Sequence, residues 1–137
     1  MTWAFDVDGT LIGSIRSDRL RPGAAELLAA LVDRGQTLML WSAGGAEYAQ
    51  RMADAHGIAH HFAAFYAKAD RGIDNRYLVE HFDPRHRPQV FVDDSPIDLS
   101  IDAVVIEVSQ FLGGNPADEA LWQLIADLDE HLARGRR

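Results

Sequence analysis

The chain has 137 residues, of which 47% are hydrophobic and 25% charged, and its formal net charge at pH 7 is −8. This length suits one domain with a core of its own and is too short for two. The absence of cysteine excludes disulfides, thiolate metal sites and cysteine nucleophiles. The excess of acidic residues argues against broad binding to nucleic acid or to a membrane surface, and no apolar run approaches the roughly 18 residues that cross a bilayer. We therefore expect a cytoplasmic protein whose residues 1–137 form a single domain.

The first apolar stretch, residues 3–7, predicts a buried strand that ends in charge. Asp6 and Asp8 stand at alternate positions, and Gly9 completes a strong turn signal directly after them. Burying carboxylates costs several kcal/mol each unless something compensates for the charge, and a hard divalent cation does so most simply. Taken alone, the pattern fits an ordinary strand-end turn as well as a metal site.

Two helices and a strand are expected in the next part of the chain. Residues 9–22 show no clear period and indicate a flap-like loop. The pattern then predicts a helix over 22–35, opened by a Pro-Gly pair and ended by glycine. An apolar strand over 36–42 and the flexible run 43–45 follow, and a second amphipathic helix is predicted over 46–56.

The alternation continues in the second half. Residues 60–67 form a short aromatic-rich strand pattern, and a helix is predicted over 71–82. Short buried strands are predicted over 89–92 and 103–108, and a last helix is expected to be capped by Asn115. Strands that alternate with helices predict a parallel sheet covered on both faces.

Polar side chains stand where the predicted strands end. Right-handed crossovers place the carboxyl ends of parallel strands on one edge of the sheet, where ligands bind. If the first and fourth strands are neighbours, four carboxylates converge there and repel one another unless a cation lies between them. Oxygen ligands favour Mg²⁺ over zinc or copper. The side chains concerned are Asp6 and Asp8, Ser42, Lys68, and Asp93 and Asp94.

The remaining polar groups suit a phosphoryl group. Ser42 offers a hydroxyl, and the amides of Gly44 and Gly45 precede a helix N-terminus, which attracts anions. Lys68 supplies a compact positive charge for phosphate oxygens. We predict that Ser42, Ala43, Gly44 and Lys68 bind phosphate.

These motifs resemble the four signatures of the haloacid dehalogenase-like (HAD) superfamily. Residues 5–11, Phe-Asp-Val-Asp-Gly-Thr-Leu, match the first signature. Ser42 after its strand matches the second, Lys68 the third, and 92–98, Val-Asp-Asp-Ser-Pro-Ile-Asp, the fourth. The resemblance runs from residue 3 to about 108. It implies a three-layer α/β Rossmann-like fold, a parallel sheet of order 3-2-1-4-5 with helices on both faces.

The resemblance also implies Mg²⁺-dependent phosphoryl transfer. Asp6 would attack phosphorus and form an aspartyl-phosphate, and Asp8 would act as the general acid and then the general base. Mg²⁺ would be held by Asp6, Asp94 and the backbone carbonyl of Asp8. Asp93 would either bind the ion directly or contact one of its ligands. Dehalogenases of the superfamily lack an acid two residues after the nucleophile, so Asp8 favours phosphate chemistry.

No cap domain is expected. The intervals from Asp8 to Ser42 and from Ser42 to Lys68 are filled by a predicted helix and connecting elements, whereas an independent cap usually needs more than ~40 residues. The chain thus resembles the capless branch, which includes phosphoprotein and polynucleotide-end phosphatases. Its open site suits large or polyanionic substrates. The expected partner is a phosphorylated substrate, which could be a small ester, a phosphoprotein or a nucleic-acid end, and no membrane.

Two groups of arginines have competing interpretations. Arg16, Arg19 and Arg21 could form a basic rim that attracts a polyanionic substrate, or simply a solvated flap. The basic tail, residues 134–137, is expected to be a frayed, solvated end. An oligomer is possible but nothing in the sequence indicates one.

Two other functions use the same residues. A phosphotransferase and a non-catalytic phosphate-binding module both remain alternatives to a phosphomonoester hydrolase. A response-regulator receiver fits poorly, because its phosphorylated aspartate lies midway along the chain, whereas the second acidic pair here comes late, at Asp93 and Asp94. Nucleotide-triphosphate and dinucleotide fingerprints are absent from the sequence.

Overall fold

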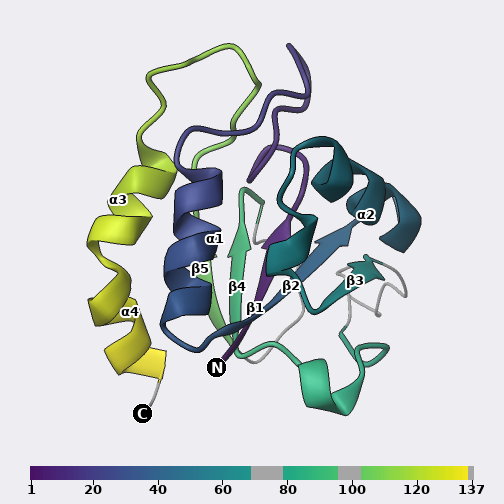
Figure 1. The fold of residues 1–137 in the computed structure, drawn as a ribbon, viewed down its shortest axis with the longest axis vertical. Helices are drawn as coiled ribbons and strands as arrows, with labels where there is room; N and C mark the ends of the chain where they lie inside the picture. The colour runs from purple at the N-terminus through teal and green to yellow at the C-terminus, as the bar shows by residue number, and fades with distance from the viewer. Residues whose placement is uncertain (69–78, 96–102, 136–137) are drawn as a thin grey trace.

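A five-stranded parallel sheet forms the centre of the molecule (Figure 1). The structure is a computed structural model that describes residues 1–68, 79–95 and 103–135. The strands lie in the order β3-β2-β1-β4-β5, and all neighbours are parallel, which confirms the predicted topology. The strands are β1 (Thr2–Asp6), β2 (Thr37–Ser42), β3 (Ala64–Ala67), β4 (Val90–Asp93) and β5 (Val104–Glu107).

The helices connect these strands much as predicted. Between β1 and β2 the chain forms one α-helix, and between β2 and β3 it forms another α-helix and a 3₁₀ turn, so neither of these fully described intervals holds a cap domain. None of the helices in the described ranges is long and apolar enough to cross a membrane. The helical elements are α1 (Ala24–Asp33), α2 (Ala46–Ala55), η1 (Ala59–His61), η2 (Pro84–His86), α3 (Ala120–Ala126) and α4 (Leu128–Gly135).

The two faces of the sheet have separate cores, because successive side chains of a strand point to opposite faces. On β1, Trp3 and Phe5 belong to the core that also includes apolar residues of α1, α2, α3 and α4. Ala4 belongs to the opposite core, which includes Trp41 and Phe82. The predicted helix over 71–82 falls mostly on residues outside the described ranges.

Strand register decides which side chains meet at the carboxyl edge. Asp6, the last residue of β1, is paired with Trp41, so Ser42 lies one residue beyond it on β2. On the other side Phe5 is paired with Val92, which places Asp93 next to Asp6. β1 is therefore the central strand, and its acidic end lies between the ends of β2 and β4.

The last helix differs from the prediction. It begins at Ala120 and is divided at Asp127 into α3 and α4. Asn115 does not cap it: its side-chain Oδ1 accepts a hydrogen bond from the Ala117 amide in a separate turn. The physical reason is Asp118, whose carboxylate is held by a buried arginine, Arg21, so the segment before Ala120 packs on that group instead of forming a first helical turn.

The third strand also begins later than predicted. His60 and His61 lie in the 3₁₀ turn η1 with their rings 4.0 Å apart, and β3 starts only at Ala64. Burial, and then the nearby His60, lower the pKa of His61. Both histidines lie outside the acidic edge of the sheet.

Candidate active site

Three carboxylates gather at the carboxyl ends of β1 and β4. One oxygen from each of Asp6, Asp93 and Asp94 lies within 4.8 Å of the other two. Octahedral Mg²⁺, with ligands at about 2.0–2.1 Å, places its ligand oxygens about 2.9–4.2 Å apart. The three oxygens are thus close to the spacing that this ion requires. The donor set is made of hard oxygen atoms, which fits Mg²⁺.

Lys68 lies against two of these carboxylates. Its Nζ is 2.8 Å from Oδ1 of Asp6 and 2.9 Å from Oδ2 of Asp93, and its side chain is largely buried. Burial lowers the pKa of Lys68, but the attraction of Asp6 and Asp93 more than offsets it, and the net shift is upward. The ammonium also lies 5.2 Å from the centre of the Trp41 ring. Lys68 is therefore a fixed positive charge at the acidic edge.

The electrostatics of the cluster favour an additional cation. Burial raises the pKa of Asp6 to about 8; the Lys68 ammonium opposes this shift, and the Asp93 carboxylate adds to it. Three carboxylates and one ammonium leave an excess of negative charge in a buried place, and such charge must be compensated. A proton on Asp6 or a divalent cation would both supply the missing positive charge.

The turn after β1 holds the acids in position. Thr10 is fully buried; its hydroxyl donates to Oδ2 of Asp6 over 3.0 Å and accepts from the Asp94 amide over 3.1 Å. Gly9 has a φ of +82°, which disfavours residues with a β-carbon. A β-carbon at Gly9 would also overlap the Asp94 carboxylate. The lack of a β-carbon at Gly9 thus permits Asp94 to approach Asp6, and the Thr10 hydroxyl fixes the two residues relative to each other.

Asp8 occupies a different position from the other acids. Its Oδ1 accepts a hydrogen bond from the Tyr48 hydroxyl over 2.7 Å. Burial, and then this hydrogen bond to Asp8, raise the pKa of Tyr48 to about 12, so the phenol remains a donor. Of the four carboxylates expected to converge, three form the cluster and Asp8 is held by α2.

The end of β2 forms a tight turn before α2. Ser42 is buried, and its Oγ accepts a hydrogen bond from the Gly44 amide over 3.0 Å. Its backbone carbonyl accepts from the amides of Gly45 and Lys68 over 3.1 and 2.8 Å, respectively. A β-carbon at Gly44 would lie 2.8 Å from Cδ1 of Tyr48, so glycine is needed for close packing here. The Ser42 hydroxyl hydrogen remains available for a ligand, and Ala43 is exposed beside it.

The prediction that Arg21 belongs to an exposed basic rim is wrong. This side chain is 1% exposed, and its guanidinium donates to both carboxylate oxygens of Asp118 over 2.8 and 3.2 Å. It also donates to the carbonyls of Gly9 and Thr10 over 3.4 and 3.2 Å. A buried guanidinium needs many acceptors, and those of Arg21 come from distant parts of the chain. Arg16 and Arg19 are exposed, as predicted.

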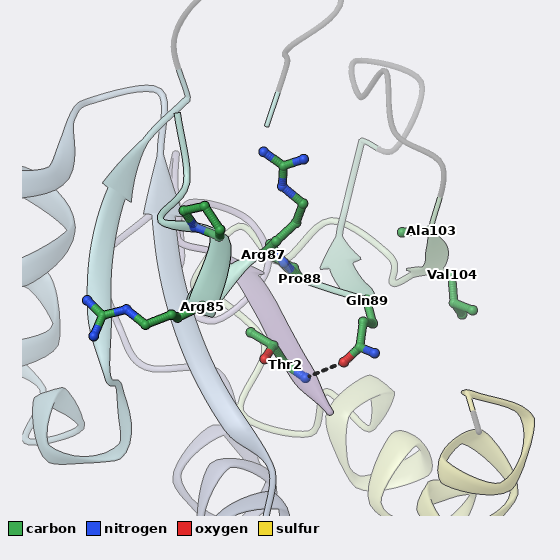
Figure 2. A pocket seen from close by; sticks show the side chains of 8 residues that line it. Thr2, Arg85, Arg87, Pro88, Gln89, Ala103 and Val104 are labelled. Carbon is green, nitrogen blue, oxygen red and sulfur yellow. Dashed lines mark hydrogen bonds between the residues drawn. The ribbon is translucent and has the colours of Figure 1, made fainter. Parts of the chain in front are cut away.

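A hollow of about 760 Å³ lies at the opposite edge of the sheet from the acids, where the strands begin (Figure 2). It is bordered by Thr2 and Val104, the first residues of β1 and β5. Figure 2 shows that the guanidinium groups of Arg85 and Arg87 extend in different directions. Arg85 is moreover paired with Asp83 over 2.8 Å. Because the two positive charges do not converge, this hollow is a poor phosphate site.

Sequence reasoning missed three residues that surround the acids. Thr10 belonged to a recognised motif, and its spacing of one helical turn from Asp6 was an available signal. Tyr48 falls in the amphipathic helix predicted over 46–56, and its ring packs against the core, but the pattern does not reveal the bond that its hydroxyl makes to Asp8. Nothing local distinguishes Arg21 from its exposed neighbours, because its main partner, Asp118, is 97 positions away.

Comparisons with known proteins agree with the fold and the motifs. A family model described as NLI interacting factor-like phosphatase matches residues 1–136. No curated protein matches the chain significantly. A crystal structure of an uncharacterised protein from Listeria monocytogenes serotype 4b aligns over 99% of both chains with a TM-score of 0.52 and 16% identity, a likeness of fold alone. The family match confirms the resemblance to capless HAD-like phosphatases, and the chain belongs to the NLI interacting factor-like phosphatase family.

Proposed function

We propose that this chain is a Mg²⁺-dependent phosphomonoester hydrolase that acts through an aspartyl-phosphate on Asp6. The observation that carries the proposal is the convergence of oxygens from Asp6, Asp93 and Asp94 within 4.8 Å at the end of the central strand. Lys68 lies directly against this cluster. A buried group of acids with excess negative charge is costly for a purely structural feature, whereas it is what a phosphoryl-transfer site requires.

Asp6, Asp94 and the backbone carbonyl of Asp8 would hold Mg²⁺, and Asp93 would bind it directly or through a ligand. The bound ion would supply positive charge for the oxygens of the transferring group. Lys68 would share this task from the other side of Asp6, since its Nζ already lies between Asp6 and Asp93. The Ser42 hydroxyl and the backbone at Ala43 and Gly44 would complete the phosphate contacts.

In the first step, a carboxylate oxygen of Asp6 attacks phosphorus and the bond from phosphorus to the leaving oxygen breaks. Asp8 gives its proton to that oxygen, so an alcohol departs and Asp6 carries the phosphoryl group. The Thr10 hydroxyl limits rotation of the Asp6 carboxylate during the attack, because it is bonded to Oδ2. Positioning of this kind supplies a large part of the barrier reduction.

In the second step, water attacks the same phosphorus and the bond to Asp6 breaks. Asp8, now ionised, accepts a proton from that water, which restores its acid form. The products are an alcohol and inorganic phosphate, and Asp6 returns to its carboxylate form. Tyr48 holds Asp8 throughout by its hydrogen bond from α2.

Turnover of 4-nitrophenyl phosphate with and without Mg²⁺ tests the proposal. We expect release of nitrophenol that depends on the ion, and a loss on the order of 10³-fold or more in Asp6→Asn, because the nucleophile is removed. Asp33→Asn, at the exposed last residue of α1, is the matched control and should retain activity. Acid-quenched wild type should carry one phosphoryl group on the peptide that contains Asp6. Equal release by wild type and Asp6→Asn would contradict the proposal.

A further inference from the structure

A cavity of about 370 Å³ lies between the 9–22 loop and the segment that follows β5. The residues that line it include Arg16, Gln110, Phe111, Leu112, Asn115 and Asp118. The loop is fixed to that segment: the Arg16 amide donates to the Leu112 carbonyl over 2.8 Å, and the Ser17 hydroxyl donates to the Gly113 carbonyl over 3.0 Å. Figure 1 shows both segments beyond the carboxyl ends of the strands. The cavity is therefore preformed.

This cavity adjoins the acidic cluster. The Phe111 amide donates to the Gly9 carbonyl over 2.8 Å, so the cavity wall is bonded to the turn that follows Asp6. A β-carbon at Gly9 would overlap the Asp94 carboxylate and lie 3.3 Å from Cγ of Gln110. Gln110 and Asp94 thus flank the same glycine. Because Gln110 lines the cavity and Asp94 belongs to the acidic cluster, the two places share Gly9 as a neighbour.

The charges of the lining favour an anion. Both oxygens of Asp118 are bonded to the Arg21 guanidinium, so this acid is neutralised. Asn115 uses its side-chain oxygen to accept from Ala117, which leaves its amide hydrogens as donors. Arg16 is exposed, makes no ion pair with any described residue, and has its Cδ close to Gly114. The cavity thus offers one uncompensated positive charge beside a strongly acidic site.

We propose that this cavity binds a second anionic group of the substrate, a carboxylate or a phosphate on the leaving-group side, and that Arg16 is its principal contact. Its guanidinium can donate two parallel hydrogen bonds to such a group, and Phe111 and Leu112 supply apolar surface for the carbon skeleton. The cavity volume is in the range of small-molecule sites. The inference rests on the proposed function for the position of the phosphoryl group and specifies its substrates as small phosphomonoesters that carry another acid.

Binding of non-hydrolysable probes tests this without requiring turnover. The probes are benzylphosphonates that carry a carboxylate, a second phosphonate or a neutral carboxamide at each ring position, and their Kd values are measured by calorimetry in Mg²⁺. We expect wild type to bind an anionic probe about tenfold more tightly than the carboxamide at one ring position or more, as a charge-assisted pair allows. The carboxylate and phosphonate series show which anion is preferred.

Three variants identify the source of this preference. Arg16→Ala should abolish it, and Arg16→Lys should keep part of it. Arg19→Ala, an exposed arginine of the same loop that does not line the cavity, should keep all of it. The inference is overturned if wild type shows no preference at any ring position, if Arg16→Ala retains it, or if Arg19→Ala loses as much. Nitrophenyl phosphate turnover, measured in parallel, shows independently whether the proposed function holds.

Discussion

The Tyr48 hydroxyl donates a 2.7 Å hydrogen bond to Oδ1 of Asp8, and this bond joins α2 to the turn that follows the central strand. The Tyr48 ring also packs on Gly44, in the turn that precedes α2. One side chain therefore contacts both the proposed acid–base residue and the proposed phosphate loop. Because the pKa of Tyr48 is raised to about 12, the phenol donates throughout the physiological pH range.

Tyr48→Phe should lower kcat by about tenfold to a hundredfold, a fraction of what a general acid contributes, with a smaller change in KM. Asp8 would lose the donor that orients it, while the ring would still pack on Gly44. The loss should be larger for alkyl phosphates, whose leaving oxygen needs a proton, than for nitrophenyl phosphate. Steady-state kinetics on both substrates provide the measurement. An equal loss on the two would show that Tyr48 does not act through proton donation by Asp8.

Gly9→Ala should remove Mg²⁺ binding and turnover, because its β-carbon would displace the Asp94 carboxylate. The positive φ also imposes a backbone cost of about 1–2 kcal/mol. Gly35→Ala is the matched control: Gly35 has a φ of +76° but nothing within 4 Å of an added β-carbon. Urea unfolding should show a loss from the positive φ in both variants, and calorimetric titration with Mg²⁺ should show a defect in Gly9→Ala alone. A Gly9→Ala protein that binds Mg²⁺ normally would contradict the assigned role of Asp94.

Removing Arg21 should destabilise the fold strongly. Arg21→Met leaves Asp118 and the carbonyls of Gly9 and Thr10 without their buried donor, and breaking a buried pair in this way costs about 3–5 kcal/mol. Urea unfolding measures the loss. Arg134→Ala is the control, because its pair with Glu130 is an exposed helical one and should contribute less than about 0.5 kcal/mol. If the two variants lost the same free energy of unfolding, the buried contacts of Arg21 would not stabilise the fold more than an exposed ion pair does.

The stabilising effect of Mg²⁺ should increase with pH. Asp6 has a folded-state pKa of about 8, raised from an ordinary value of 3.8. Its protonation therefore stabilises the metal-free fold below about pH 4, and this contribution is lost as the pH rises through 8. Because Mg²⁺ binds the ionised carboxylate and releases a proton, the rise in Tm on adding Mg²⁺ should be larger at pH 8 than at pH 6. Asp6→Asn should remove that pH dependence. A Tm increase that is the same at both pH values in wild type would contradict the assignment of Asp6 as a ligand.

Much of the fold and part of the site could be predicted from the sequence, because they depend on local patterns. Apolar runs with strand periodicity located all five strands, and their alternation with helices predicted the parallel sheet. The acids at the ends of the first and fourth strands were expected to meet once the sheet order was known, and Asp6 and Asp94 do meet. The strands and their common carboxyl edge follow from short apolar runs and crossover handedness, whereas the order of the strands was implied by the resemblance to the HAD superfamily.

Tertiary contacts decided what the local patterns could not. Arg21 and Arg16 occupy similar sequence surroundings, yet one is buried against Asp118 and the other lines a cavity beside the acids. The start of α3 at Ala120 depends on that same distant contact, and Tyr48 reaches Asp8 only because α2 packs against β2 and β3. The sequence alone thus determined the strands and the acidic residues at their ends, and its resemblance to the HAD superfamily implied the order of the strands. The ionic partners of the buried charges lie some 25 to 97 positions away along the chain, so only the folded chain decides them.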